Sequence, residues 1–469
     1  MRFFGLGLCL VMFGCAATPN KDVEHPHKTD NVVVADATRH LVKIDAEATD
    51  RFVKAGASSE LVVRLRIGVD ALPKKARSKV NLALAVDTSG SMEGDAIVHA
   101  REACMKMVDA LADGDRLAIV TFDTRAEVIV PAIVLDKKSR ALVRARIRAM
   151  QARGTTDMAG GLSAAVSQVT SGMLSDGINR VVLLGDGVPN DPAPLTAIAQ
   201  QARQNGIAIT SLGLGLDYDE TLMGQVAQLS GGKFHYVRSS EQVASVLEEE
   251  VLKIERVAGR NASLQLVAGP GVTIVEVVGH QLPMGQRVGV PVGDLVAGEQ
   301  RDVVVRLSAP ARAAGAVVEL VDAELTYQDA LGSGASVQER GFVSVRATED
   351  LAEIKGGHND EIDLATARAS VAALVIQAIA TARAGNLPEA QRLVDRAEKI
   401  AREEGRDDAE LKAKALEMPK LRKSLSAIVP APQAIAPPNG SPPVAAPRPA
   451  DAAAVREAHG AAVGTIQGG

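Results

Sequence analysis

Residues 87–91 have the composition of a cation site. The run Asp87-Thr88-Ser89-Gly90-Ser91 places a carboxylate and two hydroxyls at alternate positions, with a glycine that permits a tight turn. Oxygen ligands of this kind suit a hard divalent cation such as Mg²⁺. Serine and aspartate are also common in ordinary loops, so this run alone is a weak signal.

Two later segments carry further oxygen ligands. Gly154-Thr155-Thr156-Asp157 precedes an amphipathic segment, and Leu184-Gly185-Asp186-Gly187 follows a continuous apolar run. Together the three segments offer hydroxyls and two carboxylates that can surround a magnesium ion and leave one coordination position open. The alternative is that they are turns and helix caps in a domain without a metal.

The elements around these segments must bring them together. Residues 80–86 are apolar except for Asn81, as in a strand buried on both faces. From Asn81 to about Val257, short apolar runs then alternate with amphipathic helices. This alternation predicts a mainly parallel sheet with helices on both faces. In such sheets, ligands bind beyond the carboxyl ends of the strands, where Asp87 and Asp186 are expected.

The segment 79–257 resembles a von Willebrand factor type A domain, and the three segments match the metal-ion-dependent adhesion site of that family. The resemblance implies a Rossmann-like α/β fold. It also implies that the following residues are the metal ligands: Asp87, Ser89, Ser91, Thr156 and Asp186. Thr155 competes with Thr156, which we prefer because the family pattern Gly-x-Thr-Asp/Asn aligns with Thr156-Asp157. Gly185 departs from the family at a position that is not a ligand.

The resemblance also implies a function. In this family Mg²⁺ is the expected ion, and Mn²⁺ or Ca²⁺ could replace it. An Asp or Glu carboxylate of a protein partner completes the coordination shell of the ion, and this bond is the adhesive contact. A switch that moves the last helix, here residues 240–256, is a further feature of the family that this sequence does not decide.

The flanks of the α/β segment have a different pattern. Residues 41–68 and 262–347 alternate polar and apolar positions and contain turn signals, which predicts an antiparallel β-sandwich. The first flank has too few strands for a core of its own. We therefore expect one sandwich with the α/β domain inserted in it. These flanks resemble, more loosely, those of bacterial surface proteins and inter-alpha-trypsin inhibitor heavy chains.

The chain turns helical after residue 359. Apolar stripes at helical spacing and a break at Gly385-Asn386-Leu387-Pro388 predict a helical hairpin. The expected divisions are a signal peptide with lipobox at 1–17, a tether at 18–38, an N-terminal β segment at 39–78, the type A domain at 79–257, the sandwich at 258–350, a helical region at 359–428 and a disordered Ala/Pro-rich tail at 429–469.

The N-terminus is expected to be an export signal. Arg2 precedes an uncharged apolar stretch that is too short to span a membrane and ends at Gly14-Cys15-Ala16-Ala17. This end resembles the lipobox of bacterial lipoproteins, which implies lipidation of Cys15 and a membrane-anchored protein in the bacterial envelope. The alternative is cleavage after Ala17 and a soluble secreted product. Cys104 is expected to be a buried, inert thiol on the apolar face of a helix.

Composition and missing motifs exclude several function classes. The net charge is only −5 and aromatic residues make up 2%, which argues against a nucleic-acid partner and against a pocket for a flat small-molecule substrate. Nucleophile, metalloprotease and phosphate-loop motifs do not occur. We therefore expect a non-enzymatic envelope protein that binds an acidic protein partner through a metal. A metal-free scaffold and a metal-dependent hydrolase, with Asp157 or Asp191 as the base, remain alternatives.

Overall fold

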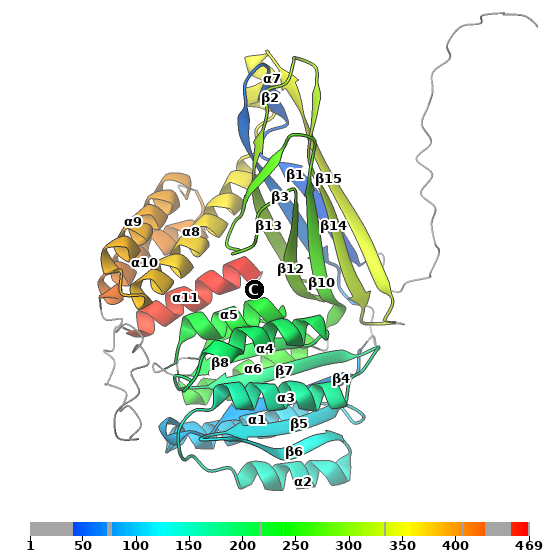
Figure 1. Cartoon of the computed structure of the whole chain (residues 1–469), viewed down its shortest axis with the longest axis vertical. Helices are drawn as coiled ribbons and strands as arrows, with labels where there is room; N and C mark the ends of the chain where they lie inside the picture. The colour runs from blue at the N-terminus through cyan, green and yellow to red at the C-terminus, as the bar shows by residue number, and fades with distance from the viewer. Residues whose placement is uncertain are drawn as a thin grey trace, which may run out of the picture. The chain divides into compact units, whose positions relative to one another are not determined.

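The computed structural model describes residues 41–72, 77–214, 218–237, 239–254, 256–332, 334–405, 407–426 and 452–467. The expected signal peptide, Cys15 and the tether lie outside these residues, as do residues 429–451 and 468–469 of the expected tail. The described residues form an α/β part, a β-sandwich and a group of C-terminal helices (Figure 1).

The α/β part is built on a six-stranded sheet with the order β6-β5-β4-β7-β8-β9. All neighbouring strands are parallel except β5 and β6, which are antiparallel. The strands are β4 (Val80–Asp87), β5 (Arg116–Phe122), β6 (Ala126–Val134), β7 (Ile178–Gly185), β8 (Ala208–Leu214) and β9 (Phe234–Val237). Because β4 and β7 are parallel neighbours, their carboxyl ends lie side by side, and so do the loops that follow them.

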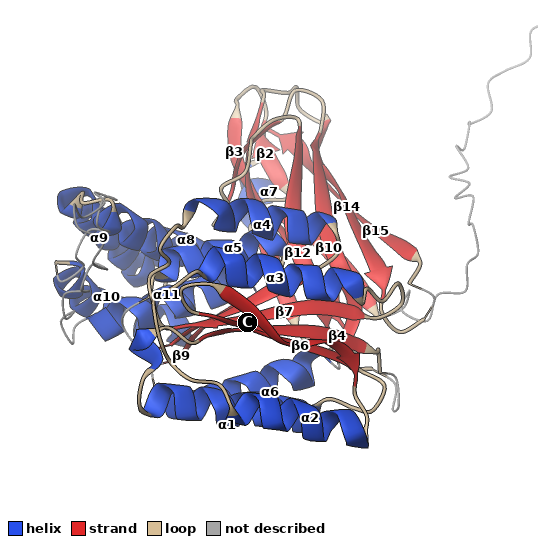
Figure 2. Cartoon of the chain, turned by 60° about the horizontal axis from the view of Figure 1, so that its bottom comes forward, coloured by secondary structure: helices blue, strands red, loops and turns tan. Residues whose placement is uncertain are grey.

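Helices cover both faces of this sheet, as Figure 2 shows. Successive strand residues point to opposite faces, so Leu82 and Leu84 of β4 pack with α1, α2 and α6, whereas Ala83 and Ala85 pack with α3, α4 and α5. The helices are α1 (Asp95–Ala110), α2 (Lys137–Arg148), α3 (Met158–Ser171), α4 (Ala193–Gln204), α5 (Glu220–Ser230) and α6 (Val243–Ile254). The expected mainly parallel sheet with helices on both faces is confirmed.

Two antiparallel sheets form the sandwich around a shared apolar core. One sheet has the order β1-β3-β13-β11 and the other β12-β10-β14-β15-β2, where β2 pairs with β15 in parallel. The strands are β1 (Val42–Ala48), β2 (Phe52–Lys54), β3 (Ser59–Val69), β10 (Val257–Ala268), β11 (Thr273–Val277), β12 (Arg287–Val296), β13 (Gln300–Ala309), β14 (Val317–Asp329) and β15 (Ser336–Thr348).

The α/β part is inserted into this sandwich. Strand β3 pairs with β13 along its whole length, from Ser59 opposite Ala309 to Gly68 opposite Gln300. The chain thus leaves the sandwich after β3, builds the α/β part and returns at β10. The expected antiparallel sandwich built from both flanks is confirmed.

The C-terminal helices are α7 (Leu351–Gly356), α8 (Asp360–Arg383), α9 (Leu387–Glu404), α10 (Ala409–Leu425) and α11 (Ala452–Gln467). By length and hydropathy, α8 could cross a membrane. A core helix of a soluble protein passes the same test, and the apolar stripe of α8 is buried against α9, α10 and α11, at Val371, Leu374, Val375, Ala378 and Ile379. The stripe therefore serves the core of this helical group.

Helix α11 corrects the expectation of a disordered segment at 429–469, which is wrong for residues 452–467. Buried residues on α11 recur at helical spacing: Val455, His459, Ala462, Val463 and Ile466. Its small residues allow close packing, and a β-carbon at Gly460 would lie 3.2 Å from Cβ of Tyr236 on β9. A stripe of alanine, histidine and single β-branched residues is only weakly apolar. In an Ala/Gly-rich segment such a stripe gives no clear helical pattern, so the sequence did not predict this helix.

Candidate functional site

The three predicted segments meet at the carboxyl end of the parallel sheet. Asp87 is the last residue of β4 and leads into a short 3₁₀ turn, η1 (Gly90–Met92). Asp186 follows the last residue of β7. Thr156 lies in the loop before α3. The parallel pairing of β4 and β7 brings the first and third segments together, and the backbone of Gly90, which donates to Gly154 O at 3.1 Å, ties the second segment to the first.

A chain of short polar contacts joins four of the five predicted ligands. The amide of Ser89 donates to Asp87 Oδ1 at 2.8 Å. The hydroxyls of Ser89 and Ser91 lie 3.0 Å apart, and Ser91 Oγ donates to Asp186 Oδ1 at 2.6 Å. The oxygen atoms of these side chains therefore face one another, as a common cation would require.

Gly187 locates the fifth predicted ligand. A β-carbon on Gly187 would lie 3.0 Å from Thr156 Oγ1, 3.6 Å from Asp87 Oδ2 and 3.6 Å from Ser91 Oγ. One small space next to Gly187 is thus bounded by predicted ligands from the first and second loops, and the missing side chain of Gly187 keeps it open. The structure places all five predicted residues around one point beyond the carboxyl ends of the central strands β4 and β7.

Asp87 provides the strongest indication that a cation belongs there. Its side chain is fully buried, and among the described residues its Oδ2 accepts no hydrogen bond. Burial, together with the nearby carboxylate of Asp186, raises the pKa of Asp87 to about 7. A buried carboxylate oxygen without a partner is costly. Two carboxylates and three hydroxyls, with no nitrogen or sulfur, are the ligand chemistry of Mg²⁺, Mn²⁺ or Ca²⁺, so the residues present fit a hard divalent ion.

The structure distinguishes the two threonines. Thr156 Oγ1 faces the space beside Gly187, whereas Thr155 Oγ1 accepts a hydrogen bond from Asn190 Nδ2 at 3.1 Å. Thr155 is therefore engaged in holding the loop, and Thr156 is the threonine directed at the site. Its role as a ligand stays a prediction.

The site opens to solvent on one side. Asp87, Ser89, Thr156 and Asp186 are buried, whereas Ser91 and Gly90 are exposed. A group that approaches from outside would therefore reach the site past the first loop.

The two aspartates that were positional candidates for a general base each accept a backbone hydrogen bond at the start of a helix. Asp157 Oδ1 accepts from Gly160 N at 3.0 Å at the start of α3. Asp191 Oδ1 accepts from Ala193 N at 3.0 Å at the start of α4. Both carboxylates thus have a local structural role.

Asn190 and Arg153 support the site and were missed by sequence reasoning. Asn190 contacts the Thr155–Thr156 segment, and Arg153 Nε donates to Asp123 Oδ2 at 2.7 Å, next to the same loop. A sequence signal existed for Asn190 alone, because Asn190-Asp191-Pro192 is typical of a turn before a helix. Nothing in a turn signal tells which neighbouring loop the asparagine contacts.

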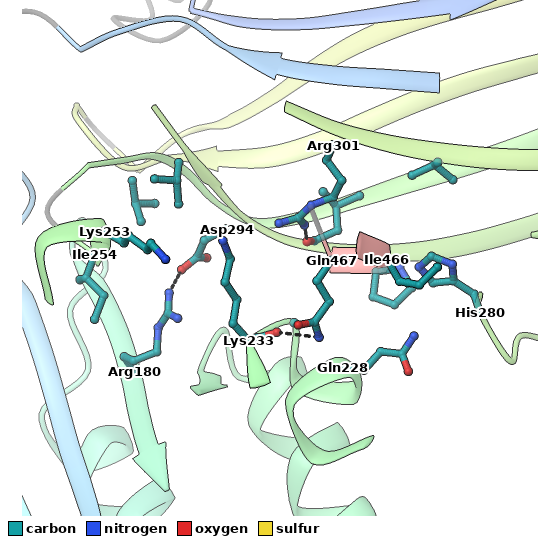
Figure 3. A pocket seen from close by; sticks show the side chains of 17 residues that line it. Arg180, Gln228, Lys233, Lys253, Ile254, His280, Asp294, Arg301, Ile466 and Gln467 are labelled. Atoms are coloured by element: carbon teal, nitrogen blue, oxygen red, sulfur yellow. Dashed lines mark hydrogen bonds and ion pairs between the residues drawn. The ribbon is translucent and has the colours of Figure 1, made fainter. Parts of the chain in front are cut away.

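Figure 3 shows a polar cavity of about 40 Å³ that is lined in part by Arg180. Arg180 lies near the start of β7, whereas Asp186 follows the end of that strand. The lining of the cavity comes from the α/β part, the sandwich and α11. Arg180 pairs with Asp294, and Lys233 pairs with Glu299 at 2.9 Å. A cavity of this size holds little more than water, so we interpret it as a polar joint between the three parts.

Comparisons with known proteins agree with this geometry. The sequence model of the von Willebrand factor type A domain matches residues 81–249. Protein YfbK of Escherichia coli (strain K12) is 28% identical over 229 residues, which are 46% of this chain and 40% of YfbK. Human inter-alpha-trypsin inhibitor heavy chain H4 is 26% identical over 192 residues, 39% of this chain and 20% of that protein. The chain thus spans less than half the length of these two relatives.

A solved structure shares the fold over more of the chain. The von Willebrand factor type A protein from Catenulispora acidiphila superposes with a TM-score of 0.66 at 22% identity, and the match covers 83% of this chain and 89% of that one. The sequence match, the parallel sheet and the three ordered loops at its carboxyl end lead to the same assignment: residues 81–249 of this chain form a von Willebrand factor type A domain.

Proposed function

We propose that this protein binds an acidic group of a partner protein through a divalent metal ion held by five residues: Asp87, Ser89, Ser91, Thr156 and Asp186. Von Willebrand factor type A domains commonly mediate protein–protein interaction or adhesion through such a site. The observation that carries the proposal is the buried Asp87 Oδ2, which accepts no hydrogen bond from the part of the chain that the structure describes and borders the space that Gly187 keeps open.

The ligand set explains why an acidic partner is expected. Three of the five side chains are neutral hydroxyls, so a bound Mg²⁺ keeps much of its positive charge and can attract a carboxylate from outside. Asp87 and Asp186 supply the opposing charge from the buried side, while the exposed Ser91 marks the open side. The partner carboxylate would therefore arrive at a position that the protein leaves to solvent.

A non-enzymatic role is part of the proposal. Each of the two aspartates considered as a base accepts a backbone hydrogen bond at the start of a helix, whereas general-base catalysis requires a group within hydrogen-bond reach of the reacting proton. The relatives include inter-alpha-trypsin inhibitor heavy chains. No observation on the described residues favours hydrolysis over binding.

We also propose that the protein acts outside the cytoplasm, anchored through a lipid on Cys15. This rests on the basic start, the apolar stretch and the lipobox-like Gly14-Cys15 pair. Metabolic labelling with a palmitate analogue in a bacterial host tests it. Label on the wild-type chain that is lost in Cys15→Ser supports the anchor, and an unlabelled, secreted wild-type chain overturns it.

Calorimetric titration of Mg²⁺ into the purified chain tests the metal site. We expect wild type to bind a single ion and Asp87→Ala and Ser89→Ala to lose that binding. Ser171→Ala, at the far end of α3, is the matched control and should bind like wild type. Acetate should increase the apparent Mg²⁺ affinity, because it can occupy the open position. Wild type that binds no ion either with or without acetate would leave the metal-free scaffold as the better account.

A further inference from the structure

Asn190 holds the backbone of Thr156 from the third loop. The amide of Asn190 donates to Thr156 O at 3.0 Å, and the amide of Thr156 donates to Asn190 Oδ1 in a longer contact of 3.5 Å. The Asn190 side chain also donates from Nδ2 to Thr155 Oγ1 at 3.1 Å. One asparagine therefore makes three contacts to the two threonines of the second loop.

Other hydrogen bonds hold the residues on either side of Thr156, among them the amide of Thr155, which donates to Thr124 Oγ1 at 3.3 Å. The first half of this loop is tied to the first loop, since Arg153 N donates to Thr88 O at 2.7 Å and Gly154 O accepts from Gly90 N. Beyond Thr156, Asp157 N donates to Asp123 O at 2.7 Å. Between these ties, Gly154 has a φ of 72°, a conformation with low steric cost only for glycine. Asn190 makes the contacts that act on Thr156 itself.

Asn190 has no role in core packing. Its side chain is exposed, and it lies four residues after Asp186 in the same loop. An amide side chain both donates and accepts, so Asn190 Oδ1 can accept from the Thr156 amide while Nδ2 donates to the Thr155 hydroxyl, and an alkyl chain can do neither. The loop that supplies Asp186 thus also sets the place of the second-loop ligand.

We propose that Asn190 is a positioning residue for metal binding, which holds Thr156 Oγ1 at the site. Through Asn190, the loop that carries Asp186 also fixes the position of Thr156, so the two ligands are placed together. This inference rests on the proposed metal site. Ligating groups must be held within about 0.5 Å of their working geometry, and loss of a residue that orients a ligand typically lowers metal affinity by about 10–100-fold.

The test compares metal affinity with thermal stability in matched variants of the whole chain. Mg²⁺ and Mn²⁺ dissociation constants are measured by calorimetry for wild type, Asn190→Ala, Thr155→Val and the double variant. Asn205→Ala, at the other end of α4, is the control. We expect Asn190→Ala to weaken binding at least about 10-fold, Thr155→Val to weaken it less, and the double variant to be no weaker than Asn190→Ala, because both act through one contact.

Unfolding temperature separates positioning from a general structural role. Asn190→Ala should melt within the range of wild type and Asn205→Ala, since an exposed loop side chain adds little to stability. Affinity equal to wild type in Asn190→Ala overturns the inference while the metal site stands. A loss of affinity with a fall in unfolding temperature beyond that of the control also overturns it. If wild type itself binds no metal, the proposed metal-binding function is contradicted, and the inference about Asn190 falls with it.

Discussion

At the scale of single residues, Gly187 matters for the side chain that it lacks. Gly187→Ala would put a methyl group 3.0 Å from Thr156 Oγ1 and into the space beside Asp87 Oδ2. The backbone of Gly187 does not need a positive φ, so the variant should fold. We expect Mg²⁺ binding to be lost at an unchanged unfolding temperature, as measured by calorimetry and thermal melts. Gly285→Ala, where a β-carbon meets nothing closer than 3.9 Å, is the control.

Cys104 is predicted to be chemically inert in the folded chain. The thiol is fully buried on α1, as expected from its helical spacing, and burial raises its pKa to about 12. A thiol reacts as the thiolate. The folded chain should therefore react with a thiol-specific disulfide reagent only after unfolding, apart from any thiol that the N-terminal segment supplies. Fast labelling of Cys104 in the native protein, identified by peptide mapping, would contradict this burial.

At the scale of elements, His358 connects the sandwich to the start of α8. Its Nδ1 lies 2.8 Å from Asp50 Oδ1, and its Nε2 lies 2.7 Å from Asp363 Oδ2. The hydrogen bond with Asp50 is the main cause that raises the pKa of His358 above its ordinary value, with Asp363 adding to it. Both ring nitrogens donate in the protonated form, so the charged histidine bridges the two carboxylates.

The pH dependence of this bridge follows from the raised pKa. Its stabilisation is fully present below pH 6.5, the ordinary pKa of histidine, and is lost as pH rises through the higher pKa of the folded state. We expect the unfolding temperature of His358→Gln to fall below that of wild type at pH 6 and to approach it at pH 9. A difference that stays constant from pH 6 to pH 9 would contradict a protonated bridge. Since the side chain is 39% exposed, the effect should be modest.

At the scale of the whole molecule, Glu220 joins the type A domain to the C-terminal helices. This fully buried carboxylate of α5 pairs with Arg383 of α8, and Nε of Arg456 on α11 lies 3.8 Å from Glu220 Oε2. Burial alone would raise the pKa of Glu220, but the two guanidinium groups outweigh burial and lower it. Arg456 also lies over the ring of Tyr218, 5.3 Å from its centroid. Buried charges from three elements thus meet at one place.

Removal of this charge should loosen α11. Glu220→Gln removes the charge that faces both guanidinium groups, while Asp219 Oδ1 stays 3.8 Å from Arg383 Nε. Removal of one partner of a buried ion pair typically costs about 3–5 kcal/mol. We expect a lower unfolding temperature and faster amide hydrogen exchange in α5 and α11. Glu249→Gln, whose carboxylate is 65% exposed and pairs with Lys253, is the control and should cost less than about 1 kcal/mol. Equal stability of the two variants would show that the cluster contributes little.

The main architecture, and the meeting of the predicted ligands at one end of the sheet, could be predicted from sequence because their signals are local. Each predicted ligand follows or precedes an apolar run that defines a strand or helix, and the order of these runs implies a parallel sheet. Residues 80–86 are apolar except for Asn81 because helices cover both faces of β4. A sheet of that kind brings the ends of β4 and β7 together whatever the intervening loops contain. The α/β fold and the meeting of Asp87 with Asp186 therefore needed no tertiary information.

Only the tertiary structure decided which residues support the site and where the C-terminus packs. The contacts of Asn190 with Thr156, and the space beside Gly187, join residues from different loops, and no spacing encodes such a meeting. The same holds for α11: its stripe is weakly apolar in sequence, and it is stabilised by burial against β9, α8 and α10 and by the approach of Arg456 to Glu220. Local pattern determines which element forms, whereas partners distant in sequence determine what each side chain does there.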